Sequence, residues 1–224
     1  MSSNEVCRSC VRCQEEGCAE AVRHINPAAL HILDQGKTSC FYQRGEQLYQ
    51  QGSMLPGLYC ISTARLKLTT LTACGKAQML GVAGPGELLG VPSVFSGQPV
   101  SHTAEALSSG VVCLFPLATV RAALEVEPEL SVNLVSSVSR LQYSTEARLM
   151  ALAGLSAPAR IAQLILEAPT SRLNRTEMAQ MAGTTLETVS RLVQHLARQG
   201  VLALSGRRVT ILRRDELEEL VRRG

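Results

Sequence analysis

Residues 184–199 read TTLETVSRLVQHLARQ, and the rest of the chain can be interpreted outward from this stretch. Apolar residues recur in it at spacings of three and four, which predicts an amphipathic helix with Thr184 as its N-cap. The predicted buried stripe consists of Leu186, Val189, Leu192, Val193 and Leu196. The opposite face is polar and carries Glu187, Ser190, Arg191 and Gln194.

A shorter helix, RTEMAQMA (175–182), is expected immediately upstream, with Asn174 as its N-cap and Gly183 as the tight turn after it. Two short helices joined in this way form a helix-turn-helix, whose second helix enters the DNA major groove. There an arginine pairs with guanine O6 and N7, and a glutamate accepts a hydrogen bond from cytosine N4. Glu187, Ser190 and Arg191 are therefore the candidate base-reading residues, and a solvated polar face is the alternative.

The run GTTLETVSRLVQHLARQGVL (183–202) resembles the recognition-helix signature of the CRP/FNR superfamily of bacterial transcription regulators. LETVSR (186–191) is similar to the FNR branch, the anaerobic regulators, because Ser190 precedes Arg191 and Leu186 stands before Glu187. The resemblance implies a homodimer that binds palindromic operators with TTGAT-like half-sites through these residues, with RNA polymerase as a further partner. Thr185 is also counted among the DNA-binding residues.

Composition and charge agree with two domains, one of which binds nucleic acid. The chain has 224 residues, of which 46% are hydrophobic and 18% charged, which is enough to bury a sizeable core. Residues 153–224 hold 11 arginines against 7 acidic residues, whereas residues 1–152 carry a net charge of −1. No apolar run approaches the roughly 18 residues of a membrane span or forms a signal-peptide core. A cytoplasmic protein with no membrane partner is expected.

Four cysteines stand close together near the start of the chain: Cys7, Cys10, Cys13 and Cys18. In a reducing cytosol such density favours metal or redox chemistry over a disulfide framework. Thiolates suit zinc or an iron–sulfur cluster. Four local thiolates could complete a zinc site, whereas a cluster that uses three of them needs a distant fourth ligand.

FNR-like sensors are similar in having an N-terminal cysteine group and a single cysteine in the β-domain, where GVVCLFP (110–116) places Cys113. The resemblance implies an oxygen- or NO-sensitive [4Fe-4S] cluster held by Cys10, Cys13, Cys18 and Cys113. Cys7 is the alternative ligand, because the spacing of Cys10, Cys13 and Cys18 departs by one residue from the best-known family spacing. Zinc, thiol oxidation, or haem on His24, His31 or His102 are the alternative sensors. Buried core positions are expected for Cys40, Cys60 and Cys74.

Residues 40–116 consist of short strand-like runs separated by turns that contain Gly or Pro, which predicts a jelly-roll-like β-domain. RGEQLYQQG (44–52) and GPGELLG (84–90) resemble the superfamily's cyclic-nucleotide-binding roll. The cyclic-AMP receptor branch holds the phosphate with an Arg-Ser pair, but the corresponding stretch SGQPVSHTA (96–104) has no arginine. Because a buried phosphate needs a compensating cation, no cyclic nucleotide is expected, and Glu87 is expected to brace a turn.

A long helix without internal Gly or Pro is expected from Glu129 to Ala153. The predicted seam for a parallel partner helix is Leu130, Leu134, Val138, Leu141 and Thr145. The resemblance implies that an intact cluster offsets an interaction that disfavours pairing of this helix. The candidate charged residues in that balance are Arg140, Glu146 and Arg148. After it, VLALSGRRVTIL (201–212) predicts a hairpin wing whose Arg207 and Arg208 reach phosphates, with solvated turn charges as the alternative.

The predicted fold class is therefore α+β: an N-terminal β jelly-roll, a long dimerisation helix and a C-terminal winged helix-turn-helix. The expected division is 1–25 for the Cys-rich cluster-binding segment, 26–128 for the sensory roll, 129–153 for the helix and 154–224 for the DNA-binding domain. No general base or substrate motif indicates an enzyme. The alternative from another class is a redox or electron-transfer protein without specific DNA binding.

Overall fold

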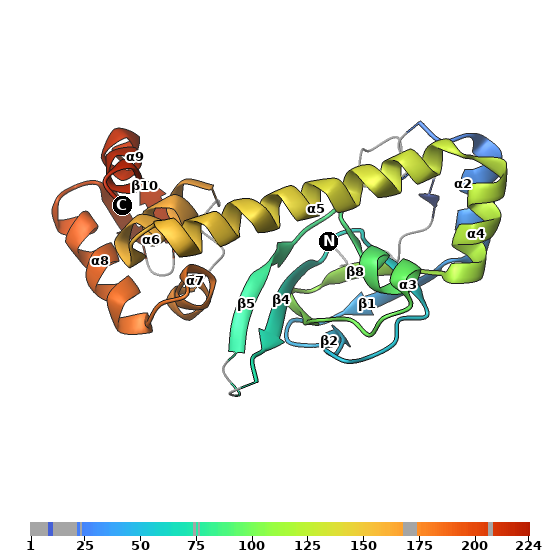
Figure 1. Cartoon of the computed structure of the whole chain (residues 1–224), viewed down its shortest axis with the longest axis horizontal. Coiled ribbons are helices and arrows are strands. Elements are labelled where there is room, and N and C mark those ends of the chain that lie inside the picture. Colours follow the sequence, from blue (N-terminus) through green and yellow to red (C-terminus); the bar gives the residue numbers. More distant parts are fainter. Residues whose placement is uncertain are drawn as a thin grey trace. The chain divides into compact units, whose positions relative to one another are not determined.

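The computed structural model describes residues 9–10, 22, 24–73, 75, 77–167, 174–205 and 208–224. The chain divides into two compact units, Met1–Gly75 with Leu80–Gln142 and Lys76–Met79 with Tyr143–Gly224. Helices and strands both occur in each unit (Figure 1), so the predicted α+β class is confirmed. None of the helices within the described ranges is long and apolar enough to cross a membrane.

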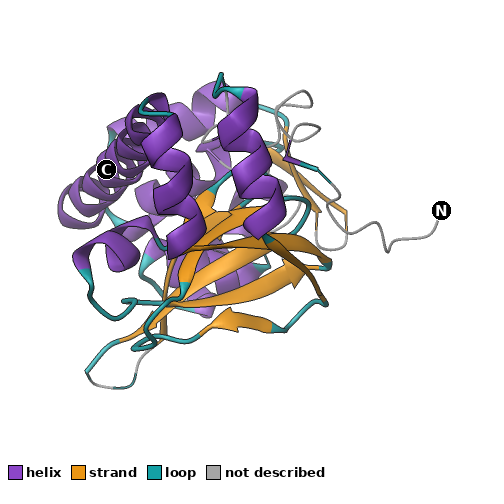
Figure 2. Ribbon diagram, turned by 90° about the vertical axis from the view of Figure 1, so that its right-hand side faces the viewer, coloured by secondary structure: helices purple, strands orange, loops and turns teal. Residues whose placement is uncertain are grey.

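The first unit is built on two four-stranded sheets (Figure 2). The first sheet has the order β1-β8-β3-β6, with β1 Thr38–Tyr42, β8 Gly110–Pro116, β3 Gly57–Ile61 and β6 Leu88–Leu89. The second has the order β2-β7-β4-β5, with β2 Gln47–Tyr49, β7 Thr103–Ser108, β4 Arg65–Leu71 and β5 Ala77–Ala83. Of the glycines expected at turns between strands, Gly45, Gly52, Gly75 and Gly86 have positive φ, whereas Gly110 is the first residue of β8 and has no positive φ.

Two apolar clusters form the core of the first unit. One lies between the two sheets and includes Tyr49, Ile61, Leu66 and Val112. The other lies on the opposite face of the first sheet, because Val111, Cys113 and Phe115 alternate with Val112 along β8 and point the other way. The helices α2 Pro27–Gly36 and α4 Leu117–Val126 lie side by side (Figure 1) and contribute to this second cluster.

The helices α2, α4 and the short α3 Val91–Ser96 were not predicted from the sequence. The start of α2 nevertheless has an ordinary signal, because the Asn26 side chain accepts a hydrogen bond from the Ala29 amide at 2.8 Å and Pro27 follows it. The prediction for Glu87 is confirmed: its Oε1 accepts a hydrogen bond from the Gly84 amide at 3.1 Å, which closes the turn before β6.

The long helix α5 spans Glu129–Gly154. The seam predicted for it is wrong in its first half, because Leu130 and Leu134 are buried in the core of their own unit and Val138 packs against that core. Leu141 is exposed. The face of the helix that remains available at its N-terminal end is the opposite one, where Val132 and Val135 are 53% and 65% exposed.

The second unit contains α6 Ala157–Glu167, α7 Arg175–Ala182, α8 Leu186–Arg198, β9 Leu202–Ser205, β10 Arg208–Ile211 and α9 Arg214–Arg222. The strands β9 and β10 pair antiparallel, as expected for a hairpin wing. The core of this unit is completely buried and includes Ile161, Ile165, Met178, Val193 and Leu217. The winged helix-turn-helix that the sequence predicts is present.

Candidate nucleic-acid interface and cysteine site

The first helix of the helix-turn-helix begins with a reciprocal cap. Asn174 Oδ1 accepts a hydrogen bond from the Glu177 amide at 2.9 Å, and Glu177 Oε2 accepts one from the Asn174 amide at 2.8 Å. The helix ends at Gly183, whose φ of 60° and ψ of 43° are left-handed and favour glycine. Asn174 and Gly183 therefore have the roles that the sequence predicts.

Two arginines hold the C-terminal end of α7. Arg160 Nε donates to the Ala182 carbonyl oxygen at 2.7 Å and its Nη1 donates to that of Leu155 at 2.6 Å. Arg148 Nη2 donates to the Met181 carbonyl oxygen at 2.8 Å. Cations at the negative end of a helix dipole are stabilising, and these two also satisfy carbonyl groups that the helix leaves unpaired. Hydrogen bonds from α5 and α6 thus stabilise the turn between α7 and α8, which sets the direction of α8.

The cap of α8 lies one residue later than predicted. Thr185, not Thr184, is the N-cap, and its Oγ1 accepts a hydrogen bond from the Thr188 amide at 3.2 Å. Thr184 instead belongs to the turn, where its amide donates to the Ala179 carbonyl oxygen. With this register Thr188 occupies the third helical position, so Glu187 completes no capping box. Glu187 therefore has no capping role that would compete with base reading.

The face that α8 buries is narrower than predicted. Val189 and Val193 are 0% exposed and Leu196 is 5% exposed, but Leu186 is 49% exposed and lies outside the buried stripe. A helix that buries three residues on one side leaves its first turns open on the other. This open side carries the candidate base-reading residues.

Glu187 and Arg191 are exposed on α8, and Ser190 between them is half-buried. They lie within about one helical turn, roughly 6 Å along the axis. Within the described part of the chain, no side-chain hydrogen bond or ion pair of these three residues is found. Their polar atoms are consequently available to an external partner.

The wing is described only in part. Arg208 opens β10 opposite Ser205, but its side chain and all of Arg207 lie outside the described residues, so their predicted phosphate contacts stay predictions. In contrast, arginines in α9 and at its two caps are engaged: Arg213, Arg214 and Arg223 make ion pairs with glutamates of α9 at 2.8 to 2.9 Å. Among α7, α8 and the wing, the basic excess that remains for DNA is therefore on α8 and the wing, since Arg175 of α7 is balanced by Glu177.

The cysteine site is described for two of its predicted ligands, because Cys7, Cys13 and Cys18 lie outside the described residues. Cys10 and Cys113 are 4% and 3% exposed, and both belong to the apolar cluster on the outer face of the first sheet. Residues more than 100 positions apart in the sequence therefore share one buried environment. This is the arrangement that a ligand set with a distant fourth cysteine requires.

The surroundings of Cys10 are unusual for a thiol in an apolar core. Lys37 Nζ lies 3.6 Å from Cys10 Sγ and 2.6 Å from Asp34 Oδ1, and the Lys37 side chain is only 6% exposed. The Cys10 amide donates to the same Asp34 oxygen at 2.8 Å. Burial raises the pKa of the Cys10 thiol to about 12, although the nearby Lys37 charge acts in the opposite direction.

Cys113 lies in the middle of β8, between β1 and β3 in the first sheet. The Ser39 hydroxyl oxygen is 3.3 Å from Cys113 Sγ on one side, and Cys60 is its partner on the other. Burial was expected for Cys40 but is wrong: Cys40 is opposite Val112 at the edge strand β1 and is exposed. Cys60 is half-buried. Cys74 lies outside the described residues.

The three histidines that were candidate haem ligands are either hydrogen-bonded within the protein or exposed. His102 Nε2 is 2.9 Å from the Tyr49 hydroxyl and its Nδ1 is 3.4 Å from the Ser101 hydroxyl, so both ring nitrogens have protein partners. Burial lowers the pKa of His102. His24 and His31 are exposed.

Comparison with known proteins agrees with this two-part organisation. Residues 39–127 match the model of the cyclic nucleotide-binding domain, and residues 159–220 match that of the Crp-like helix-turn-helix domain. The fumarate and nitrate reduction regulatory protein of Escherichia coli strain K12 is 28% identical over 191 residues, which cover 80% of this chain and 76% of that protein. The chain belongs to the CRP/FNR family. It is a DNA-binding transcription regulator and not an enzyme.

Other relatives of this CRP/FNR regulator extend the comparison. A CRP-like cAMP-activated global transcriptional regulator of Mycobacterium tuberculosis is 24% identical over 213 residues, covering 89% of this chain and 94% of that protein. The structure of FixK2 from Bradyrhizobium japonicum has the same fold, with a TM-score of 0.73, 24% identity, and coverage of 82% of this chain and 96% of that one. That this chain binds no cyclic nucleotide stays a prediction.

Proposed function

We propose that this CRP/FNR regulator is a homodimer whose sequence-specific DNA binding is gated by an oxygen- or NO-sensitive [4Fe-4S] cluster. The observation that supports it most is the burial of Cys10 and Cys113 in one apolar cluster of the first unit. The proposed ligands are Cys10, Cys13, Cys18 and Cys113, with Cys7 as the alternative. When bound, the cluster supplies reactivity toward dioxygen or nitric oxide, which removes it from its ligands.

The described residues suit such a group in charge and in donors. A cluster on four thiolates is anionic, and the buried Lys37 ammonium, which is ion-paired with Asp34, also lies 3.6 Å from Cys10 Sγ, where it would offset part of that charge. The Ser39 hydroxyl is placed to donate to Cys113 Sγ. Both are the kind of outer hydrogen bonds that orient thiolate ligands. Zinc bound by the N-terminal cysteines alone is the alternative, and it needs no ligand from β8. Metal analysis distinguishes the two, because it measures iron and zinc separately.

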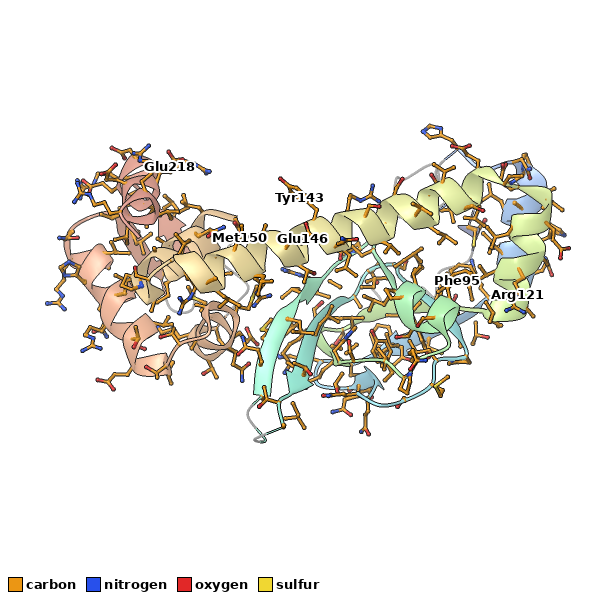
Figure 3. The ribbon with its side chains drawn as sticks, in the orientation of Figure 1. Phe95, Arg121, Tyr143, Glu146, Met150 and Glu218 are labelled. Atoms are coloured by element: carbon orange, nitrogen blue, oxygen red, sulfur yellow. The ribbon has the colours of Figure 1, made fainter. Side chains whose placement is uncertain are left out.

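The exposed face of α5 supports the homodimer with a seam different from the predicted one. Residues at spacings of three and four along this face are Val132, Val135, Ser139, Gln142, Glu146, Leu149 and Ala153. Leu149 is 65% exposed. Tyr143, which is labelled on α5 in Figure 3, lies beside the seam and is 76% exposed. In a parallel two-fold pair each seam residue meets its own copy, so two Glu146 carboxylates would face each other. That repulsion opposes pairing, and binding of the cluster is proposed to overcome it.

Two-fold pairing would present two α8 helices to successive major grooves of a palindrome. We propose TTGAT-like half-sites read by Glu187, Ser190 and Arg191, with backbone contacts from Thr185, Arg207 and Arg208. RNA polymerase is the proposed further partner, and the cytoplasm the proposed place of action. The proposed functional division is a cluster-binding segment over 1–25, a sensory roll over 26–128, a dimerisation helix over 129–153 and a DNA-binding domain over 154–224.

The proposal is tested with a matched pair of cysteine variants, Cys113→Ser and Cys40→Ser. Both cysteines lie on adjacent strands of one sheet, but only Cys113 faces the cluster of buried residues. We expect anaerobically purified Cys40→Ser to hold iron and to bind a palindromic operator as the parent does, and Cys113→Ser to lose both. A Cys113→Ser protein with the full iron content of the parent would contradict the proposed ligand set.

A further inference from the structure

A second cysteine lies directly opposite the proposed β-domain ligand. In the antiparallel pair β3 and β8, Cys60 is the partner of Cys113, and Tyr59 and Ile61 are the partners of Leu114 and Val112. Directly opposed residues point to the same face of a sheet. Both thiols accordingly border the same apolar cluster, Cys113 inside it and Cys60 packed against it. Neither cysteine is in a disulfide.

The backbone spacing at this pair fits a disulfide. Opposed residues of an antiparallel ladder have Cα atoms about 4.5 to 5.5 Å apart, within the roughly 4.4 to 6.8 Å that disulfides span. The Cβ atoms of such a pair are about 4.5 to 5.5 Å apart. They must move about 0.5 to 1.5 Å closer to reach the roughly 4 Å found in disulfides. Ser39, the partner of Cys113 on β1, offers a hydroxyl and no thiol. Cys60 is therefore the cysteine that the sheet presents to Cys113.

We infer that Cys60 and Cys113 form a reversible cross-strand disulfide when Cys113 holds no metal, so that the pair is a thiol latch on the sensory domain. The regulatory meaning of this latch rests on the proposed cluster function, whereas the bond itself does not. The oxidant is a peroxide. The Cys60 thiol, which is more exposed than Cys113, reacts with hydrogen peroxide to give a sulfenic acid and water. The Cys113 thiol then displaces water from that sulfur, and the S–S bond forms.

Formation of this bond would remove one proposed ligand from use. A chain that has lost its cluster under oxidising conditions would then stay unable to rebuild it until a thiol reductant cleaved the disulfide by exchange. Loss of the cluster alone would then be readily reversed, whereas loss of the cluster followed by the disulfide would persist until the disulfide was reduced. Substitution of Cys60 leaves every proposed ligand in place, so the effect of the latch can be separated from that of the ligands.

The bond is tested on full-length, iron-free, reduced protein treated with hydrogen peroxide, alkylated and digested with trypsin. Cys60 is the sole cysteine of the tryptic peptide 45–65, and Cys113 is the sole cysteine of 77–121, so mass spectrometry can assign a linked pair. We expect the linked peptide in the parent and in Cys40→Ser, and its absence in Cys60→Ser and Cys60→Ala. Free alkylated Cys60 and Cys113 in the oxidised parent would overturn the inference.

The regulatory role is tested by incubating the same samples with ferrous iron and sulfide without oxygen and recording the visible spectrum. We expect the peroxide-treated parent to load a cluster only after dithiothreitol, and peroxide-treated Cys60→Ser to load one directly. Equal loading of oxidised and reduced parent would overturn the latch. A linked peptide in a protein that loads no cluster even when reduced would uphold the disulfide and refute the proposed function.

Discussion

Arg191 offers the sharpest test of base reading because its substitution has no structural cost in the described chain. Its side chain is exposed on α8 and has no hydrogen bond or ion pair with any described residue. We expect Arg191→Ala to change the free energy of unfolding by less than about 0.5 kcal/mol, as for other exposed positions. Any loss of DNA binding in the variant is then a loss of contacts with DNA.

The expected magnitude follows from one bidentate arginine–guanine contact in each half-site. Such a pair is worth about 1 to 3 kcal/mol of discrimination against another base, so two half-sites give about 2 to 6 kcal/mol. At about 1.4 kcal/mol for each tenfold change, the parent should prefer the operator with both guanines by roughly 30-fold to more than 10,000-fold. Arg191→Ala should reduce that preference to about one, since no partner remains for guanine O6 and N7.

The assay is competition binding followed by fluorescence anisotropy at fixed salt concentration, with the palindrome as probe and a palindrome changed at both guanines as competitor. Arg198→Ala is the matched control, because Arg198 is exposed on the last turn of the same helix. We expect the control to keep the preference for guanine. Undiminished preference in Arg191→Ala would refute the assignment of Arg191 as a base-reading residue.

Three further predictions concern stability. Asn174→Ala removes the capping box of α7 and should cost about 1 kcal/mol in urea unfolding, and a loss below about 0.3 kcal/mol would contradict the cap. Leu217→Ala empties a completely buried position and should cost about 2 to 5 kcal/mol, whereas Leu212→Ala, at a residue 58% exposed, should cost little. Because burial lowers the pKa of His102 from 6.5, the unfolded chain takes up the proton first as the pH falls. Native stability should decrease below about pH 6.5 in the parent and less in His102→Gln, and equal pH profiles would contradict this.

Local signals in the sequence were sufficient for the helix-turn-helix. Asn174 and Gly183 mark the ends of α7 by cap and turn chemistry that depends on neighbours only, and both have the predicted roles. The cap of α8 was harder, because Thr184 and Thr185 are adjacent and either hydroxyl could accept the bond. The turn decides between them: the Thr184 amide is used to close α7, so the helix starts after Thr185.

Predictions that depended on tertiary packing failed more often. The stripe of Leu130 and Leu134 has the period of a dimer seam, but periodicity does not say whether a helix packs on another chain or on its own sheet. Cys40 has an apolar neighbourhood in the sequence and is nevertheless exposed, because β1 is an edge strand. The partnership of Cys60 with Cys113 could not be predicted at all, because it depends on the register of two strands that are far apart in the chain.

The proposed [4Fe-4S] cluster would be visible in the absorption spectrum of the protein purified without oxygen. Iron, sulfide and zinc are measured on the same sample before and after air is admitted. We expect a straw-brown absorption band with about four irons and four sulfides per chain, which bleaches in air. A colourless protein with about one zinc per chain would contradict it and move the sensor to thiol chemistry, and a sharp Soret band would assign the sensor to haem.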